Sequence, residues 1–187
     1  VINTFKLLRK EFGNVEIIAG NVATKEGALD LMSAGADCCK AGVGGGSVCL
    51  TRIVTGSGVP QLHCVLECCK AGEEMDIPVM ADGGIRTSGD IVKAIGAGAN
   101  SVMLGNILAG TEESPGTVMM KEGKKYKIYR GSAGYGTALS RKQQKIGDLN
   151  ITEYTPEGVE SLVPYKGHVH EVVGQLLGGL RSGMSYA

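Results

Sequence analysis

One cysteine in this chain stands at the end of a glycine-rich run. Residues 42–46 read Gly-Val-Gly-Gly-Gly, and Ser47, Cys49 and Thr51 follow at alternate positions. Glycines bring backbone N–H groups close to an anion and carbonyls close to a cation. A cysteine among such dipoles can act as a nucleophile when its pKa is lowered, and the Thr51 hydroxyl could move a proton. The alternative is a tight turn followed by a buried structural cysteine.

The segments around this run repeat one pattern. Four times, an apolar stretch leads into a glycine-rich turn and then into helical periodicity. We expect strands over 15–21, 37–41, 78–84 and 101–105, and helices over 25–34, 61–74 and 88–97, with a short helix after the last strand. Strands that alternate with helices predict a parallel sheet with right-handed crossovers. The residues with chemistry follow the carboxyl ends of these strands, where α/β barrels and open α/β sheets both carry their sites.

The number of units favours a barrel fragment. A complete (β/α)8 TIM barrel needs about 250 residues and eight units, whereas this chain has 187 residues and four visible units. We therefore predict an α/β fold in which residues 1–187 form one partial catalytic domain, the C-terminal half of a (β/α)8 barrel.

The second half of the chain departs from the repeat. Residues 117–129 read as a β-hairpin around Lys121-Glu122-Gly123-Lys124-Lys125. Residues 131–162 are polar and irregular, which predicts a mobile flap that closes over a ligand. A last helix is expected over 168–181, because apolar residues recur there on one face.

Composition excludes several classes of protein. The 19 basic and 19 acidic residues balance, so no electrostatic footprint for nucleic acid or an anionic membrane exists. No apolar run approaches the roughly 20 residues of a membrane span, and the charged start of the chain does not resemble a signal peptide. The six cysteines predict free thiols in a cytoplasmic protein. The adjacent pairs 38–39 and 68–69 are expected to be small core residues rather than metal ligands.

Several motifs together resemble one family. In collinear order they are Gly44-Gly45-Gly46-Ser47-Val48-Cys49-Leu50-Thr51-Arg52, Val54-Thr55-Gly56, Gly58-Val59-Pro60-Gln61, Asp82-Gly83-Gly84-Ile85-Arg86 and Glu112-Glu113-Ser114-Pro115-Gly116. This combination resembles the IMP dehydrogenase/GMP reductase family over nearly the whole chain. The resemblance implies a (β/α)8 barrel, usually tetrameric, of which this chain matches the second half. The strands that carry part of the cofactor site are absent from it.

The resemblance also implies roles for individual residues. Cys49 would attack C2 of a purine nucleotide and form a covalent adduct, with Thr51 assisting proton transfer. The residues that would hold the 5′-phosphate are Ser47, Gly83, Gly84 and Gly105, with Asn106 and Tyr129 beside them. Glycine turns at adjacent strand ends supply the several N–H donors that a phosphate needs.

Three further assignments follow from the resemblance. Asp82 would bind the ribose hydroxyls, since a carboxylate can accept two hydrogen bonds from a diol; its alternative role is a helix N-cap. Glu157 would contact the base from the flap; its alternative is a solvated loop carboxylate. The carbonyls of Gly44, Gly46 and Cys49 match positions that hold a monovalent cation, K⁺, in the dehydrogenases.

The family contains two activities. The dehydrogenase oxidises IMP with NAD⁺ and hydrolyses the adduct, and it activates water with an Arg-Tyr pair on the flap. No Arg-Tyr dipeptide occurs between Gly131 and Pro164. This absence and the reductase-like stretch 60–68 favour GMP reductase with NADPH. Other stretches, such as 85–90 and 163–167, resemble bacterial dehydrogenases.

One departure speaks against the reductase. Reductases carry a glutamate after the hairpin that partners the threonine, and Gly134-Tyr135-Gly136 occupies that place here. Glu153 or Glu157 could substitute if the flap folds inward. IMP dehydrogenase with NAD⁺ and a nucleotide-binding paralogue without turnover therefore stay open as alternatives.

Overall fold

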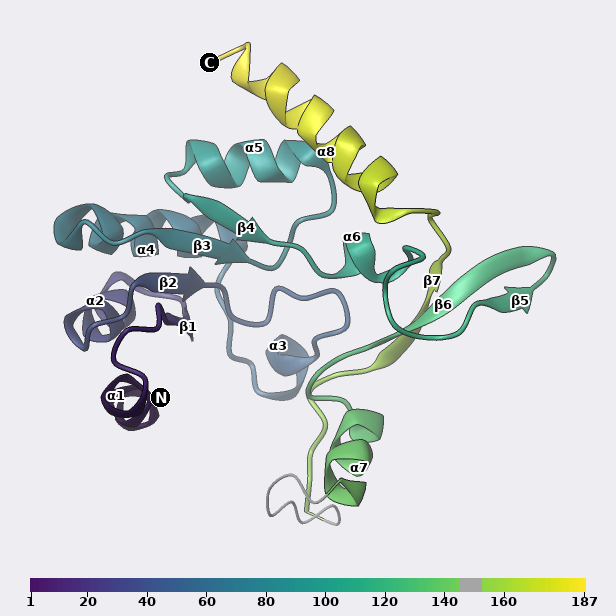
Figure 1. Ribbon diagram of the computed structural model, residues 1–187, viewed down its shortest axis with the longest axis horizontal. Coiled ribbons are helices and arrows are strands. Elements are labelled where there is room, and N and C mark those ends of the chain that lie inside the picture. The colour runs from purple at the N-terminus through teal and green to yellow at the C-terminus, as the bar shows by residue number, and fades with distance from the viewer. Residues whose placement is uncertain (145–152) are drawn as a thin grey trace.

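The computed structural model describes residues 1–144 and 153–187 (Figure 1). Its helices are α1 (Ile2–Glu11), α2 (Lys25–Ser33), α3 (Thr51–Val54), α4 (Gln61–Met75), α5 (Ser88–Gly96), α6 (Asn106–Ala109), α7 (Tyr135–Gln143) and α8 (Val169–Met184). Its strands are β1 (Ile18–Val22), β2 (Cys38–Ala41), β3 (Val79–Asp82), β4 (Ser101–Met103), β5 (Met119–Lys121), β6 (Lys124–Arg130) and β7 (Glu160–Pro164). Among these residues no helix combines the length and the apolar character needed to cross a membrane.

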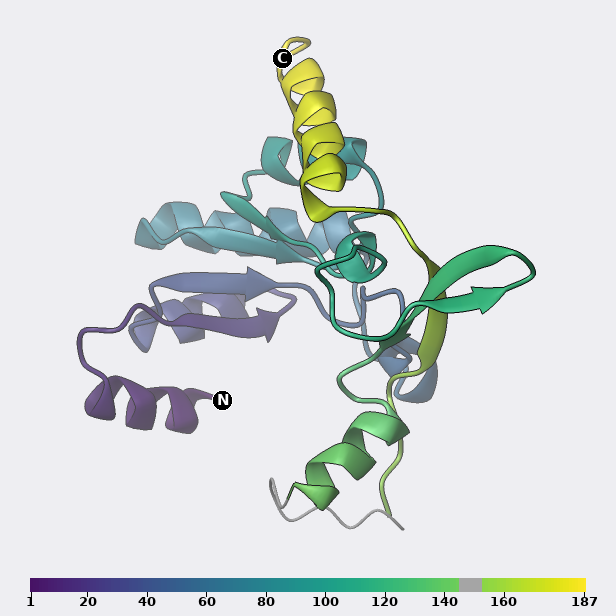
Figure 2. The same ribbon diagram turned by 45° about the vertical axis from the view of Figure 1, so that its right-hand side comes forward.

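The first four strands form a parallel sheet in the order β1-β2-β3-β4. Neighbouring strands pair in sequence order, with Ala19 opposite Cys39 and Cys39 opposite Val79. Helices α2 and α4 lie together along one face of this sheet (Figures 1 and 2). The predicted α/β fold with a parallel sheet is confirmed, and each predicted strand and helix of this half appears with ends shifted by at most a few residues.

Small side chains fill the space between the sheet and its helices. Ala28, Cys39, Cys64 and Ala71 are fully buried there, in a core that contains few large residues. Burial raises the pKa of Cys39 to about 12, so this thiol stays protonated at neutral pH. In each adjacent cysteine pair at least one member is buried, and the six cysteines are free thiols. No cluster of metal-binding side chains occurs in the part of the chain that the structure describes.

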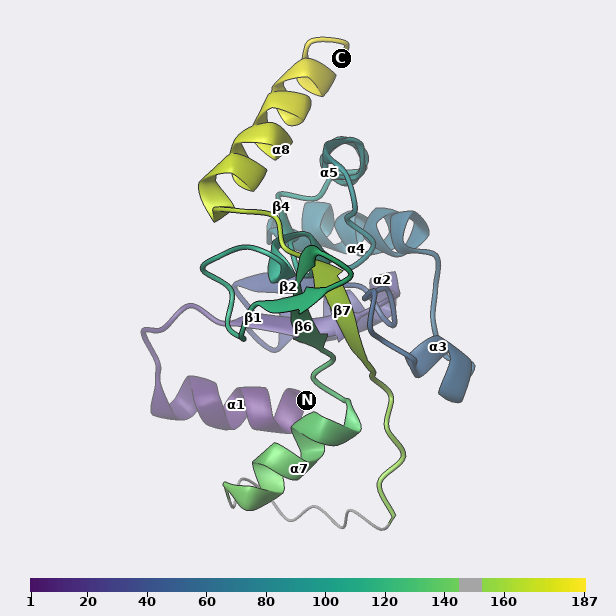
Figure 3. The ribbon, with the colours of Figure 1, turned by 90° about the vertical axis from the view of Figure 1, so that its right-hand side faces the viewer.

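Strands β5, β6 and β7 form a separate antiparallel sheet. The pair β5–β6 lies where the hairpin over 117–129 was expected, and the hairpin extends away from the rest of the chain (Figure 1). The whole second sheet lies across the carboxyl ends of the parallel strands (Figure 3).

The expectation that residues 131–162 are irregular is wrong for part of that stretch. Helix α7 starts within it, and β7 pairs with β6 from Glu160 onward. Only Val163 is buried in β7, so the apolar alternation that signals a strand is weak. The residues of β6 that pair with β7 lie 30 to 38 positions earlier in the chain. Residues 145–152 lie outside the described residues. Mobility of the flap and its closing over a nucleotide stay predictions.

Helix α8 packs closely against α5. Gly179 of α8 lies against Ser88, and Gly183 lies against Val92 of α5, so the two helices approach closely beside β4 (Figure 1).

Thr87 caps α5 in a capping box with Asp90. Asp82 is therefore not the N-cap of this helix.

Candidate functional site

Two glycine loops meet at the carboxyl ends of β2 and β3. The amide of Gly84 donates to the carbonyl of Gly45 over 3.1 Å. A Cβ on Gly83 would lie 3.1 Å from the Cα of Gly45, and Gly83 has a φ of +104°. Both facts require glycine at position 83. The cysteine loop and the Asp-Gly-Gly turn thus form one continuous surface, as their positions after neighbouring strands predicted.

Gln61, at the start of α4, contacts both loops. Its Nε2 donates to the carbonyl of Ala41 over 3.0 Å. Its side chain is also the nearest neighbour of Gly84, and it lies against Gly42 and Gly45. The sequence analysis did not single out this residue as part of the site.

Cys49, Thr51 and Glu157 form a chain of polar contacts. The Sγ of Cys49 lies 3.2 Å from Oγ1 of Thr51, and Thr51 donates to Oε2 of Glu157 over 2.7 Å. All three side chains are partly buried. Cys49 is accessible, unlike the core cysteines, and Glu157 is not a solvated loop carboxylate.

Backbone hydrogen bonds hold Glu157 in this place. The amide of Leu50 donates to the carbonyl of Glu157 over 2.7 Å, and the amide of Val159 donates to the carbonyl of Val48 over 3.0 Å. Cys49 forms an isolated antiparallel bridge with Gly158. The segment before β7 therefore acts as a short strand partner of the cysteine loop.

Asp82 lies at the end of β3 beside two residues that the sequence analysis missed. Its Oδ2 accepts a hydrogen bond from Asn21 over 2.9 Å and forms an ion pair with Lys40. Its Oδ1 accepts no hydrogen bond within the described residues. Asn21 and Lys40 occupy the carboxyl ends of β1 and β2, and that position was the signal that could have revealed them.

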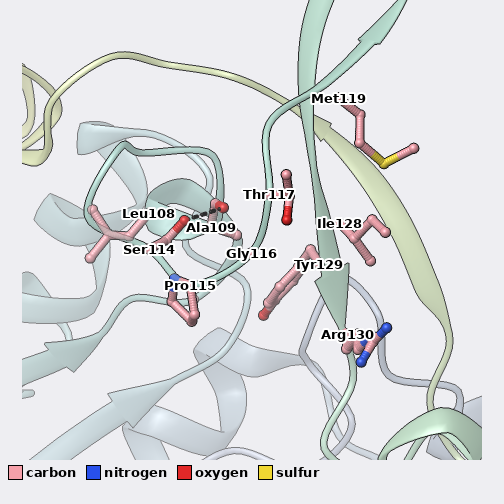
Figure 4. Close-up of a pocket in the computed structure, with 11 residues that line it drawn as sticks. Leu108, Ala109, Ser114, Pro115, Gly116, Thr117, Met119, Ile128, Tyr129 and Arg130 are labelled. Carbon is pink, nitrogen blue, oxygen red and sulfur yellow. Dashed lines mark hydrogen bonds between the residues drawn. The ribbon is translucent and has the colours of Figure 1, made fainter.

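Tyr129 separates two cavities. A cavity of 270 Å³ contains Cys49 and Glu157 in its wall. A larger cavity of 580 Å³ lies on the other side, lined by Leu108, Pro115, Ile128 and other largely apolar residues (Figure 4). Burial, and to a lesser degree the nearby Asp82 carboxylate, raises the pKa of the Tyr129 phenol. Of these two cavities, only the smaller one is lined by Cys49 and Glu157.

The remaining predicted residues surround Tyr129 and the cysteine loop. A Cβ on Gly105 would lie 3.0 Å from the hydroxyl of Tyr129, so this glycine and the phenol are in contact. Asn106 begins α6 directly after Gly105. Ser47 is exposed at the tip of the cysteine loop and makes no hydrogen bond within the described residues.

The proposed cation ligands lie within one turn. Gly44 has a φ of +70°, and the carbonyl of Gly46 accepts the amide of Cys49 over 3.2 Å. That bond uses one of the two lone pairs of the Gly46 oxygen. Three backbone carbonyls make only part of a coordination shell, so a cation here would need further oxygen ligands from elsewhere.

Comparison with known proteins decides the family. A sequence model of the IMP dehydrogenase / GMP reductase domain matches residues 1–187. The chain belongs to this family. Its resemblance to the family, carried by the cysteine loop and the Asp-Gly-Gly turn, is thereby confirmed.

Members of the IMP dehydrogenase/GMP reductase family with both names are similar to this chain. An inosine-5′-monophosphate dehydrogenase of Nitrosopumilus maritimus is 52% identical over 99% of this chain and 40% of its own length. A GMP reductase of Leishmania major is 55% identical over 92% of this chain and 35% of its own length. The chain thus spans about two fifths of these relatives, and sequence identity alone does not separate the two activities.

A solved structure of the family shows the same fold. A GMP reductase of Trypanosoma brucei, in complex with guanosine 5′-monophosphate, superposes with a TM-score of 0.93 at 53% identity. The match covers 99% of this chain and 38% of that chain. The parallel sheet described above therefore corresponds to the C-terminal half of the barrel, as the four βα units predicted.

Proposed function

We propose that this chain contributes the nucleophile and the nucleotide-binding turns of a GMP reductase, which converts GMP to IMP and ammonia with NADPH. The observation that carries the proposal is the chain of contacts from Cys49 through Thr51 to Glu157. A thiol, a hydroxyl and a carboxylate in this order can attack a carbon and deliver a proton to a leaving group.

The residues act in two stages. The Cys49 sulfur forms a bond to C2 of GMP, and the 2-amino group leaves as ammonia with a proton relayed by Thr51. NADPH, when bound, supplies a hydride for C2. The Cys49 thiolate then leaves C2 with the electrons of the carbon–sulfur bond, which gives IMP. The carboxylate of Glu157 holds the Thr51 hydroxyl in position, takes up the Cys49 thiol proton through that hydroxyl as sulfur attacks C2, and returns it through the same hydroxyl to the departing amine.

Glu157 supplies a carboxylate where the reductase pattern lacks its expected glutamate. The expected reductase glutamate is missing at 134–136, where the chain instead begins α7. Glu157 reaches Thr51 from the other end of the flap, whereas Glu153 is exposed. The absence of an Arg-Tyr pair from residues 131–164 leaves the dehydrogenase reaction without its usual means of activating water.

The other site residues give the nucleotide its orientation. The base occupies the 270 Å³ cavity beside Cys49, and Oδ1 of Asp82 accepts hydrogen bonds from the ribose. The 5′-phosphate lies among Ser47, Gly84 and Gly105, next to the hydroxyl of Tyr129. Because the amide of Gly84 is already bonded to the carbonyl of Gly45, the other backbone N–H groups of these turns supply the donors.

The described residues hold only part of a cofactor site. A cavity of 270 Å³ lies below the usual range of about 300–1,000 Å³ for ligand pockets, so it is too small to hold a dinucleotide together with the purine. We expect the nicotinamide end alone to contact this chain. A K⁺ ion at Gly44, Gly46 and Cys49 and a homotetrameric assembly are proposed on the family resemblance.

A paired assay on full-length protein tests the proposal. We expect GMP with NADPH to give IMP and ammonia, and IMP with NAD⁺ to give no NADH. The reverse result would favour IMP dehydrogenase, which the 52% identity to the N. maritimus enzyme keeps as the second candidate. Inactivity in both arms, together with a Cys49 that resists alkylation, would favour a nucleotide-binding paralogue.

A further inference from the structure

The segment 157–167 touches both ends of the proposed nucleotide site. At its start, Glu157 and Val159 bond the cysteine loop. At its end, the amide of Lys166 donates to the carbonyl of Gly110 over 2.8 Å, and the amide of Glu112 donates to the carbonyl of Gly167 over 2.8 Å. A single stretch of backbone thus links the nucleophile to the loop that follows the phosphate turn, Gly105–Asn106.

The side chain of Lys166 extends this link to the turn itself. Its ammonium donates to the carbonyl of Asn106 over 3.2 Å and to the carbonyl of Ile107 over 2.9 Å. Because a trans peptide points its N–H opposite to its carbonyl, these bonds direct the N–H of Ile107 away from the lysine. The ammonium therefore fixes the orientation of the peptide groups that follow Gly105.

The charge of this ammonium has no partner in the described residues. Lys166 is half-buried and forms no ion pair there, although Arg86 and Glu171 line the same 540 Å³ cavity. Burial lowers the pKa of Lys166, as expected for a cation whose hydration is reduced. An anion on the far side of the turn would compensate this charge.

We infer that Lys166 is a positioning residue for the 5′-phosphate of the nucleotide: it orients the turn at Gly105–Asn106 and places a positive charge behind it. The inference rests on the proposed function. Lys166 acts through the backbone of the turn and does not touch the reacting atoms. Its loss should weaken ligands that carry a phosphate and leave nucleosides unaffected.

The test measures how GMP and guanosine protect Cys49 from iodoacetamide in full-length protein, with the Cys49 peptide followed by mass spectrometry. In Lys166→Met, which keeps the aliphatic stem, we expect the GMP concentration for half-protection to rise at least tenfold and that for guanosine to change less than twofold. Lys166→Arg keeps the donors and should return the GMP value to within threefold of wild type. Lys70→Met, which removes an exposed ammonium from α4, should behave as wild type.

Other outcomes overturn the inference in distinguishable ways. Equal losses for GMP and guanosine in Lys166→Met, or no loss for GMP, would show that Lys166 has no phosphate-specific role. If neither GMP nor IMP protects Cys49 in the wild-type protein, the proposed function is overturned, and this inference falls with it. If Lys166→Met does not fold, Lys166→Gln replaces it, with at least a threefold rise for GMP alone expected.

Discussion

The hydroxyl of Thr51 donates to the carboxylate of Glu157 over 2.7 Å, although 106 residues separate them in the chain. The same hydroxyl lies 3.2 Å from the sulfur of Cys49. Backbone pairing between the cysteine loop and the start of the 157–167 segment keeps the two residues together. The proposed reaction depends on this pairing.

Replacing the nucleophile should separate binding from turnover. In Cys49→Ala we expect kcat to fall by at least about three decades, as is typical for loss of a covalent nucleophile, with GMP affinity by calorimetry within threefold of wild type. Cys38→Ala changes another partly accessible thiol and should keep full activity. A Cys49→Ala protein that retains more than about one per cent of wild-type turnover would exclude covalent catalysis by this residue.

Thr51 and Glu157 should act as one unit. Thr51→Val and Glu157→Gln should each lower kcat about 100-fold or more, the usual contribution of a positioned proton-transfer group. The double variant should lose little beyond the worse single variant, because either change breaks the same relay. Glu153→Gln removes an exposed carboxylate and serves as the control. Fully additive losses in the double variant would contradict a shared relay.

Gly105 should tolerate no side chain in the nucleotide complex. A Cβ there would lie 3.0 Å from the hydroxyl of Tyr129, and the carboxylate of Gly105→Asp would also repel the phosphate. We expect GMP affinity by calorimetry to fall at least tenfold, or about 1.4 kcal/mol. Gly96→Ala is the matched control, since nothing lies within 4 Å of a Cβ at that position of α5. Unchanged affinity in Gly105→Asp would place the phosphate elsewhere.

The cap of α5 gives a prediction for stability against pH. Hydrogen bonds from the amides of Arg86 and Thr87, at 3.0 Å each, hold the pKa of Asp90 below its usual value, with the Arg86 amide as the largest cause. A lowered pKa in the folded state stabilises the protein above the unfolded pKa, and this contribution is lost as the pH falls through the folded pKa.

Urea unfolding of full-length Asp90→Ala should therefore show a loss of about 1 kcal/mol at pH 7, the usual size of a helix-cap effect. The difference from wild type should shrink below about pH 4, near the unfolded pKa of an aspartate. Asp30→Ala, an exposed position within α2, should show no such pH dependence. A difference that stays constant down to pH 2 would contradict the role of the ionised carboxylate.

Local sequence patterns could predict the parallel half of the molecule. Apolar strands, glycine turns and amphipathic helices occur there in repeating order, so the positions of Cys49 and Asp82 at strand ends follow from short-range periodicity. The pairing of β7 with β6 depends on residues 30 to 38 positions apart, and the exposure of most β7 side chains hides the apolar alternation of a strand. The resemblance gave Glu157 a contact with the base. The sequence left Glu153 and Glu157 as alternative partners of Thr51, because it does not show the path of the flap between α7 and β7.

The buried lysines show a different limit of sequence reasoning. Lys127 is 2% exposed and donates to the carbonyls of Thr111, Glu112 and Ser114. From the sequence, a lysine in a polar hairpin is expected to be exposed to solvent. The residues next to it in the chain give no sign that three backbone carbonyls of another loop accept its hydrogen bonds. The same reason concealed Lys40 and Lys166, whose partners also lie in distant segments.

The contact between Gly45 and Gly83 has a consequence for how this site can change. The two residues touch backbone to backbone, with no side chain between them to absorb an adjustment. A side chain at either of these two positions forces the facing loop to move, and Cys49 or Asp82 moves with its loop. Directed evolution that randomises the cysteine loop alone should therefore recover few folded variants, whereas libraries that vary residues 42–47 and 82–86 together would sample both halves of the contact at once.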